Sequence, residues 1–211
     1  MERIWLSSWP EGLPKSLRYP DNPLPWFLKH NALKWPDKPA IVYYGRVLTF
    51  RELDVAVDRC ASALVRLGVG KGDRVSLYLE NCPQYVIAFL AALRAGAIAV
   101  PTNPMLKEAE LEYELNDAGA ETAVALDSLY PYLERIRDRT PLRNVVVTSF
   151  QDYLPSEPTL PVHASMKTGK LCLLNTVDFM DLVEERSTVP PASIDVSQDI
   201  AVLQYTSGTT G

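Results

Sequence analysis

Apolar residues recur along the chain in two patterns, one with helical spacing and one in short continuous runs. The helical pattern is clearest after Thr49, where one face carries Leu53, Val57, Cys60, Ala61, Leu64 and Leu67. Thr49 can cap the first backbone amides while Glu52 reaches back, and Gly68 suits a left-handed stop. We therefore predict a helix with one buried face between Thr49 and Gly68.

The two patterns then alternate as far as residue 148. Short strand-like runs fall at 74–79, 97–100, 122–126 and 144–148, and helical segments lie between them at 83–95, 108–118 and 129–137. Strands that alternate with helices imply parallel βαβ crossovers. The predicted fold class is therefore α/β, with a mostly parallel sheet flanked by helices.

Shorter elements flank this core. They are a helix over 26–34, a hairpin of strands 40–44 and 47–49 joined across Gly45-Arg46, a helix over 177–185, and a strand over 199–205. The 17 prolines concentrate in residues 10 to 39 and 155 to 191. The predicted organisation is an N-terminal arm and helix (1–38), an α/β core (39–149), a proline-framed insertion or connection (150–198), and a strand with a loop (199–211). The extended arm, residues 1–25, is expected to pack over the body.

Composition and charge narrow the class of protein. A formal net charge of -5 without long runs of like charge argues against a nucleic-acid partner. Cys60, Cys82 and Cys172 are widely separated and form no CxxC pair, so a reduced, cytoplasmic protein is expected. The longest apolar run, 85–100, is shorter than the ~20 residues that span a bilayer. A peripheral membrane contact and a homo-oligomer stay open.

The loop after residue 205 has the composition of a phosphate-binding loop. Its glycines allow tight turns that aim backbone amides at phosphate oxygens, and its hydroxyls add donors; its residues are Thr206, Ser207, Gly208, Thr209, Thr210 and Gly211. Two residues rather than four separate the glycines, which excludes the P-loop pattern. A flexible Ser/Thr/Gly tail is the alternative for these residues alone, and the strand-like run before them favours the ligand loop.

Several segments together resemble the adenylate-forming superfamily of acyl-CoA synthetases, luciferases and nonribosomal peptide adenylation domains. Tyr205 to Gly211 resemble the signature loop, and the other matching segments are 48–53, 70–75, 81–84 and 93–104. The resemblance covers most of residues 35–211. The Val100-Pro101-Thr102-Asn103-Pro104 ending looks more like fatty acyl-CoA ligases than amino-acid-activating domains.

The resemblance implies a two-step reaction. A fatty acid carboxylate attacks ATP to give an acyl-adenylate and pyrophosphate, and the thiol of coenzyme A then displaces AMP. Thr206, Ser207, Gly208, Thr209, Thr210 and Gly211 would hold the β and γ phosphates of ATP with Mg²⁺. The family's remaining ATP contacts and its Lys on a mobile C-terminal domain lie beyond this loop. The resemblance therefore implies an N-terminal fragment that is inactive alone, with no catalytic residue and no protein metal ligand of its own.

Two other functions stay open on the sequence. One is a non-catalytic nucleotide-binding or interaction module, and the other is an adenylating ligase for an aryl or amino acid. His30 and His163 have no positioned partner in the sequence pattern and are interpreted as structural or exposed.

Overall fold

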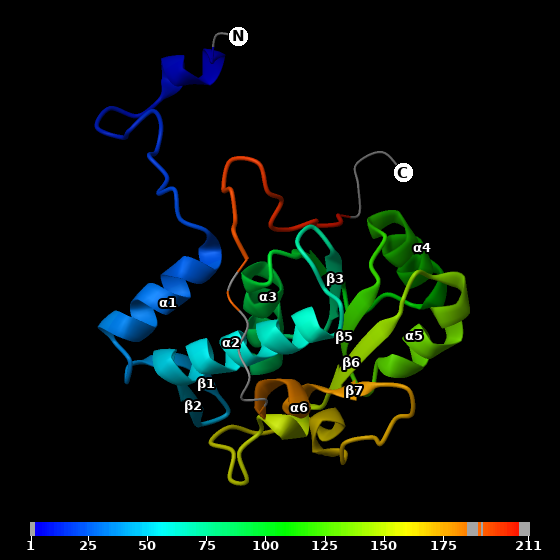
Figure 1. The fold of residues 1–211 in the computed structure, drawn as a ribbon. Coiled ribbons are helices and arrows are strands. Elements are labelled where there is room, and N and C mark those ends of the chain that lie inside the picture. The colour runs from blue at the N-terminus through cyan, green and yellow to red at the C-terminus, as the bar shows by residue number, and fades with distance from the viewer. Residues whose placement is uncertain (1–2, 185–189, 191, 207–211) are drawn as a thin grey trace.

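A parallel sheet forms the centre of the computed structural model, which describes residues 3–184, 190 and 192–206. The strands are β3 (Arg74–Tyr78), β4 (Ile98–Pro101), β5 (Thr122–Leu126), β6 (Asn144–Thr148) and β7 (Val177–Asp178). They pair in the order β4-β3-β5-β6-β7, and every pairing is parallel (Figure 1). The predicted α/β class and its parallel sheet are confirmed.

Helices cover both faces of this sheet (Figure 1). Helices α2 (Phe50–Arg66), α3 (Pro83–Arg94) and α6 (Phe179–Glu184) pack on one face. Helices α4 (Glu108–Ala118) and α5 (Tyr130–Ile136) pack on the other. We call the apolar cluster under α2, α3 and α6 the first core and the cluster under α4 and α5 the second core. In β5, Val124 and Leu126 belong to the first core, while Ala123 and Ala125 belong to the second. A strand buried on both faces is the reason its residues form a continuous apolar run.

The start and end of α2 follow the sequence pattern. The Thr49 hydroxyl accepts a hydrogen bond from the Glu52 amide at 3.2 Å, and the Glu52 carboxylate accepts one from the Thr49 amide at 2.8 Å. Gly68 has a φ of 94° and ends the helix in the left-handed region. The predicted capping box and glycine stop are both confirmed.

The hairpin of β1 (Pro39–Tyr43) and β2 (Arg46–Thr49) turns one residue earlier than predicted. Its central residues are Tyr44 and Gly45, with φ of 50° and 97°, and not Gly45 and Arg46. Two positive φ values suit the right-handed twist of a two-residue hairpin. Arg46 belongs to the strand, where its guanidinium donates to the Asp152 carbonyl at 3.1 Å.

The helix predicted over 177–185 begins two residues later than its pattern suggested. Val177 and Asp178 form β7, paired with Val146 and Val147 of β6. The Asp178 carboxylate accepts a hydrogen bond from the Met180 amide at 2.8 Å, which favours a helix start just after it. Thus β7 and α6 complete the sheet and its first core from within the proline-framed region. Short 3₁₀ helices lie at Arg137–Arg139, Phe150–Asp152 and Ala164–Lys167.

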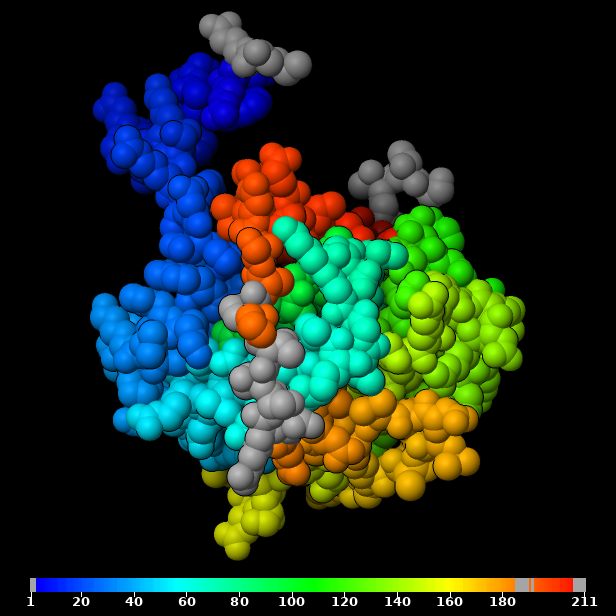
Figure 2. Space-filling view, viewed as in Figure 1, coloured from blue at the N-terminus to red at the C-terminus, as the bar shows by residue number. Residues whose placement is uncertain are grey.

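The N-terminal arm extends away from the body and does not pack over it as expected (Figures 1 and 2). It holds a 3₁₀ helix, Ile4–Ser8, and Ile4 and Trp5 are 78% and 61% exposed. Prolines at positions 10, 14 and 20 disfavour a regular element that could dock. Helix α1 (Leu24–Lys34) follows and packs on α2 and α3. Across the described part of the chain, no helix has the length and apolar content to cross a membrane.

A buried ionic network joins α1, α2 and α3. The Arg94 guanidinium contacts Asp54 at 2.9 Å and Asp58 at 2.7 Å, and the Arg94 and Asp54 side chains are only 7% and 8% exposed. Lys29 of α1 reaches the same two carboxylates at 2.9 and 3.2 Å. Arg94 also donates to the carbonyls of Asp54 and Pro25. Three helices are therefore tied at one guanidinium.

Replacing Arg94 by Met is expected to lower the free energy of unfolding by about 3 kcal/mol, because a buried carboxylate loses its main partner. Urea unfolding followed by circular dichroism measures the loss. Arg143→Met is the matched control, since Arg143 is 75% exposed in its pair with Glu121 and should change stability by about 1 kcal/mol or less. Equal losses in the two variants would contradict the structural importance assigned to Arg94.

Candidate functional site

The structure describes the approach to the predicted phosphate loop and the first residue of that loop. Thr206 is exposed. The other predicted contacts lie outside the described residues: Ser207, Gly208, Thr209, Thr210 and Gly211. We call residues 199–206 the stem. The stem runs along the edge of the sheet from the α3 side toward α4 (Figure 1). The described residues show which contacts hold the stem in place.

The backbone of the stem pairs with the edge strand β4 at a single residue. The Ala99 amide donates to the Ala201 carbonyl at 2.9 Å, and the Leu203 amide donates to the Ala99 carbonyl at 3.0 Å. Ala99 and Val202 form one parallel bridge. The strand predicted over 199–205 is therefore wrong as a regular element, although its pairing partner is the edge of the sheet.

The number of free backbone donors on β4 limits its pairing with the stem. Residues two apart along a strand face the same neighbour, so the next donors toward the stem would be those of Ala97 and Pro101. The Ala97 amide already donates to the Ala92 carbonyl at 2.9 Å, and proline has no N–H. The edge of β4 can therefore offer the stem one donor, that of Ala99.

An ion pair holds the beginning of the stem. The Lys71 ammonium lies 2.6 Å from the Asp199 carboxylate and donates to the Ser193 carbonyl at 2.9 Å. The same carboxylate accepts a hydrogen bond from the Asp195 amide at 2.7 Å. Donation from Lys71, followed by that from the Asp195 amide, lowers the pKa of Asp199. Asp199 therefore stays ionised and fixes the start of the stem to the turn before β3.

A tyrosine holds the end of the stem on the opposite side. The Tyr205 hydroxyl donates to the Asp117 carboxylate of α4 at 2.6 Å. Burial, followed by the hydrogen bond to Asp117, raises the pKa of Tyr205. The hydroxyl therefore keeps its proton at neutral pH and remains a donor. Thr206 follows directly after this anchored residue.

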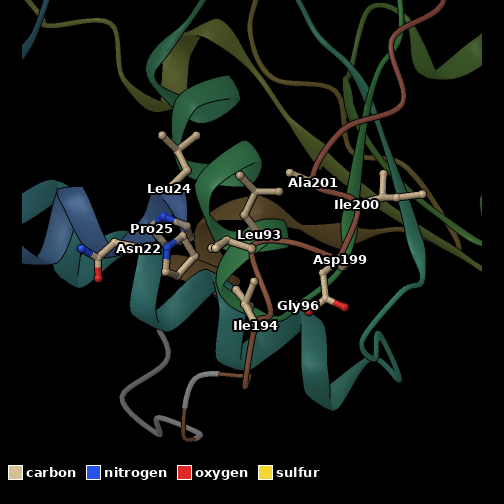
Figure 3. Close-up of a pocket in the computed structure, with 12 residues that line it drawn as sticks. Asn22, Leu24, Pro25, Leu93, Gly96, Ile194, Asp199, Ile200 and Ala201 are labelled. Atoms are coloured by element: carbon tan, nitrogen blue, oxygen red, sulfur yellow. The ribbon is translucent and has the colours of Figure 1, made fainter. Parts of the chain in front are cut away.

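The stem also forms one wall of a pocket of about 230 Å³ (Figure 3). Figure 3 shows side chains from three parts of the chain around it: Leu24, Leu93, Ile194, Asp199, Ile200 and Ala201. Ligand pockets commonly occupy about 300–1,000 Å³ and place several polar groups toward the ligand. A small and mainly apolar pocket does not suit a polyphosphate, so we do not assign the phosphate site to it.

A buried carboxyl group lies on α4 near Tyr205 of the stem. Glu114 of α4 is 5% exposed and shares a hydrogen bond with Thr102, whose hydroxyl also donates to the Val100 carbonyl at 3.2 Å and lies 2.9 Å from the Ser76 hydroxyl. Among the described residues, the Glu114 Oε1 atom has no hydrogen-bond partner. Burial raises the pKa of Glu114, and the hydrogen bond from Thr102 offsets this only in part. Burial therefore makes the charged form of this carboxyl group less favourable than it is in water.

The carboxyl ends of β5 and β6 are covered by the chain itself. Ligands of doubly wound sheets commonly bind at these ends, next to the point where the strand order reverses, which here lies between β3 and β5. The Asp127 carboxylate, which follows β5, accepts a hydrogen bond from the Leu171 amide at 3.1 Å. The Lys170 ammonium lies 2.9 Å from Asp152 and 2.6 Å from Asp178. The stem at the free edge of β4 therefore remains the better candidate for a ligand approach.

Most of the residues that anchor the stem carry no local signal in the sequence. Lys71 stands in a segment that resembled the family, but the pattern did not indicate its pairing with Asp199. Asp117 lies in a helical run, where a carboxylate normally faces solvent. His163 accepts a hydrogen bond from the Ser165 amide at 3.3 Å, and His30 stacks on Trp26 with ring centroids 4.8 Å apart. Both histidines have local structural contacts, as interpreted.

Comparison with known proteins identifies relatives along nearly the whole chain. A family model described as AMP-binding enzyme matches residues 28–211. A long-chain-fatty-acid–CoA ligase of Bacillus subtilis (strain 168) is 37% identical over 216 aligned residues, which cover 100% of this chain and 39% of that protein. The chain thus spans well under half the length of the curated relatives it matches.

Solved structures show the same fold. The crystal structure of an anthranilate CoA ligase in complex with anthranoyl-AMP superposes with a TM-score of 0.76 at 28% identity, covering 92% of this chain and 34% of that one. A long-chain-fatty-acid–CoA ligase from Archaeoglobus fulgidus gives a TM-score of 0.75 at 27% identity, covering 93% and 36%.

The buried Glu114 predicts a pH-dependent difference between the wild type and Glu114→Gln. Its pKa in the folded state lies above the ordinary value of 4.5, so the folded state binds the proton more tightly than the unfolded state does. The wild type should therefore lose stability relative to the variant as pH rises through the folded-state pKa. Urea unfolding of both proteins between about pH 4 and pH 8 measures the difference. A difference that is constant over this range would contradict the assignment.

Proposed function

The chain belongs to the AMP-binding enzyme family, and we propose that it forms the N-terminal portion of an ATP-dependent fatty-acid–CoA ligase. The observation that carries the proposal is the family match over residues 28–211, together with 37% identity to a long-chain-fatty-acid–CoA ligase along the full chain. That relative is much longer than this chain, so the proposed ligase activity belongs to a longer protein that contains these residues.

In this proposal the loop that begins at Thr206 binds the β and γ phosphates of ATP. Its amides and hydroxyls would stabilise negative charge as it moves onto the leaving pyrophosphate, and no covalent catalysis by the loop is required. The stem supports this role because the residues just before Thr206 are held to both β4 and α4. A fixed base reduces the entropy lost when the loop engages a ligand.

The proposed Mg²⁺ fits the loop only as an ion shared with the nucleotide. Nowhere in the described residues do three His, Cys, Asp or Glu side chains gather as a metal site. Mg²⁺ is commonly bound through substrate phosphates, water and few protein ligands, which agrees with a loop of hydroxyls and amides. We therefore assign the ion to the ATP phosphates, and we assign none of the described residues as its dedicated ligand.

The identity of the acid is a separate question. The name of the Bacillus subtilis relative favours a long-chain fatty acid, whereas the structural neighbour with anthranoyl-AMP acts on an aryl acid. We propose the fatty acid because the sequence similarity to the long-chain ligase is higher, at 37% against 28%. A panel of fatty, aryl and amino acids, assayed with a longer protein containing this chain, discriminates between them.

The 211-residue chain is expected to bind Mg-ATP through the loop. Thr206→Val removes one hydroxyl at nearly constant volume and should weaken binding about fivefold, which corresponds to one hydrogen bond of about 1 kcal/mol. Isothermal titration calorimetry measures both proteins. Thr168→Val is the control, because the Thr168 hydroxyl donates to the Ser165 carbonyl far along the chain from the loop. Equal affinities in the wild type and Thr206→Val would count against the phosphate role of Thr206.

The same chain alone is expected to form little or no acyl-CoA from ATP, coenzyme A and palmitate. Joining it to the downstream region of the Bacillus subtilis ligase should restore acyl-CoA formation. Release of pyrophosphate and consumption of the coenzyme A thiol measure the two half-reactions. Ligase rates of the isolated chain equal to those of the relative would refute the fragment interpretation. A folded chimera that binds ATP but forms no adenylate with any acid would favour a non-catalytic module.

A further inference from the structure

We propose that Asp117 is a positioning residue for the phosphate loop, acting through its hydrogen bond with Tyr205. The pair forms a clamp between the end of α4 and the end of the stem, and it sets the path of the backbone into Thr206. This inference rests on the proposed function, since the loop must bind phosphate for its positioning to matter.

The contact itself is short and involves a charged acceptor. The Tyr205 hydroxyl lies 2.6 Å from Asp117 Oδ2, within the range of hydrogen bonds from hydroxyl groups to carboxylates. Such bonds are stronger than neutral ones because the acceptor is ionised. Tyr205 is half-buried and packs against the second core, so its ring is held while its hydroxyl reaches the helix.

The Asp117 end of the clamp is a fixed point. The Arg74 guanidinium donates to the Ala118 carbonyl at 2.7 Å and to the Gly119 carbonyl at 2.6 Å. The Asn116 amide group donates to the Arg139 carbonyl at 3.0 Å. Asp117 therefore stands between the Asn116 side chain, which is bonded to the segment after α5, and two backbone carbonyls that are bonded to Arg74 of β3. A residue held on both sides can act as a reference for the stem.

The placement of Asp117 is otherwise unfavourable for α4. The C-terminus of a helix carries partial negative charge, so a carboxylate in the last turn destabilises it. No basic side chain occupies the last turn of α4. Asp117 is therefore a carboxylate at a position that the helix alone would disfavour, and it accepts a hydrogen bond from the Tyr205 hydroxyl.

The clamp also acts close to the other attachment of the stem. The Leu203 amide is bonded to Ala99 of β4, and Tyr205 is bonded to Asp117 two residues later. Toward Thr206, β4 offers no second donor, because Pro101 has no N–H. Tyr205 therefore supplies the last constraint before Thr206. Without it, the backbone from Leu203 to Thr206 gains conformations, and fixing that backbone on ligand binding then costs more entropy.

Four variants of the 211-residue chain test the proposal: Tyr205→Phe, Asp117→Ala, the double variant and Asp117→Asn. Tyr113→Phe is the matched control, because Tyr113 also lies on α4 and is 67% exposed. Hydrogen exchange of residues 199–206 is measured without nucleotide. The affinity for Mg-ATP is measured by calorimetry, and global stability by urea unfolding.

Tyr205→Phe and Asp117→Ala are each expected to speed exchange of the Leu203 amide about tenfold and to weaken Mg-ATP binding about fivefold, consistent with loss of one charge-assisted hydrogen bond. The double variant should match the single variants, because both remove the same bond. Asp117→Asn keeps an acceptor and should lie between them and the wild type. Asp117→Ala should leave global stability unchanged or raise it, since an unfavourable charge leaves the helix end.

The measurements test the clamp, the positioning role of Asp117 and the phosphate role of the loop separately. Unchanged exchange in Tyr205→Phe would show that the clamp does not hold the stem. Faster exchange with unchanged Mg-ATP affinity would show that the clamp is structural only, which overturns the positioning role. If the wild-type chain binds no Mg-ATP, the phosphate role fails together with the positioning role, while the exchange data still show whether the clamp exists. Effects of Tyr113→Phe equal to those of Tyr205→Phe would overturn the specific pairing.

Discussion

The architecture depends on a parallel sheet that must be covered on both faces. All five residues of β5 are buried, and their side chains alternate between the two cores. Parallel strands require crossover connections, which place helices on both faces. Once α2, α3 and α6 occupy one face and α4 and α5 the other, the surfaces left to a ligand-binding segment are the ends and edges of the sheet. One of these edges is β4, where the stem lies.

The edge of β4 explains why the approach to the loop is not a regular strand. Ala99 offers both of its backbone groups to the stem, whereas Ala97 is already bonded and Pro101 lacks a donor. The stem therefore relies on side chains to fix its remaining length. Lys71 holds one end through Asp199, and Asp117 holds the other through Tyr205. The stem is thus held by one backbone attachment, at Ala99, and by side-chain contacts at its two ends.

The main elements could be predicted because their determinants are local. The Thr49 and Glu52 capping box, the Gly68 stop and the alternation of apolar runs each lie within a few residues in the sequence. The errors arose where a distant partner decides the structure. Arg46 lies in β2, where its side chain bonds to the Asp152 carbonyl more than one hundred residues away. Val177 is in a strand because it pairs with β6. A phosphate loop after residue 205 stays a prediction from composition, and the contacts of the stem before it could not be predicted, since Asp117 and Tyr205 are 88 positions apart.

The contacts that hold the stem differ in strength from those that hold the helices. Arg94 and Asp54 are almost fully buried, so breaking their pair leaves a desolvated charge and costs several kcal/mol. The Lys71 side chain is 49% exposed and Asp117 lies at the surface, so each stem contact contributes only about 1 kcal/mol. Local opening of the stem is therefore much less costly than opening of the helical body. A ligand that binds next to the stem can therefore shift it with the modest free energy that a few hydrogen bonds supply.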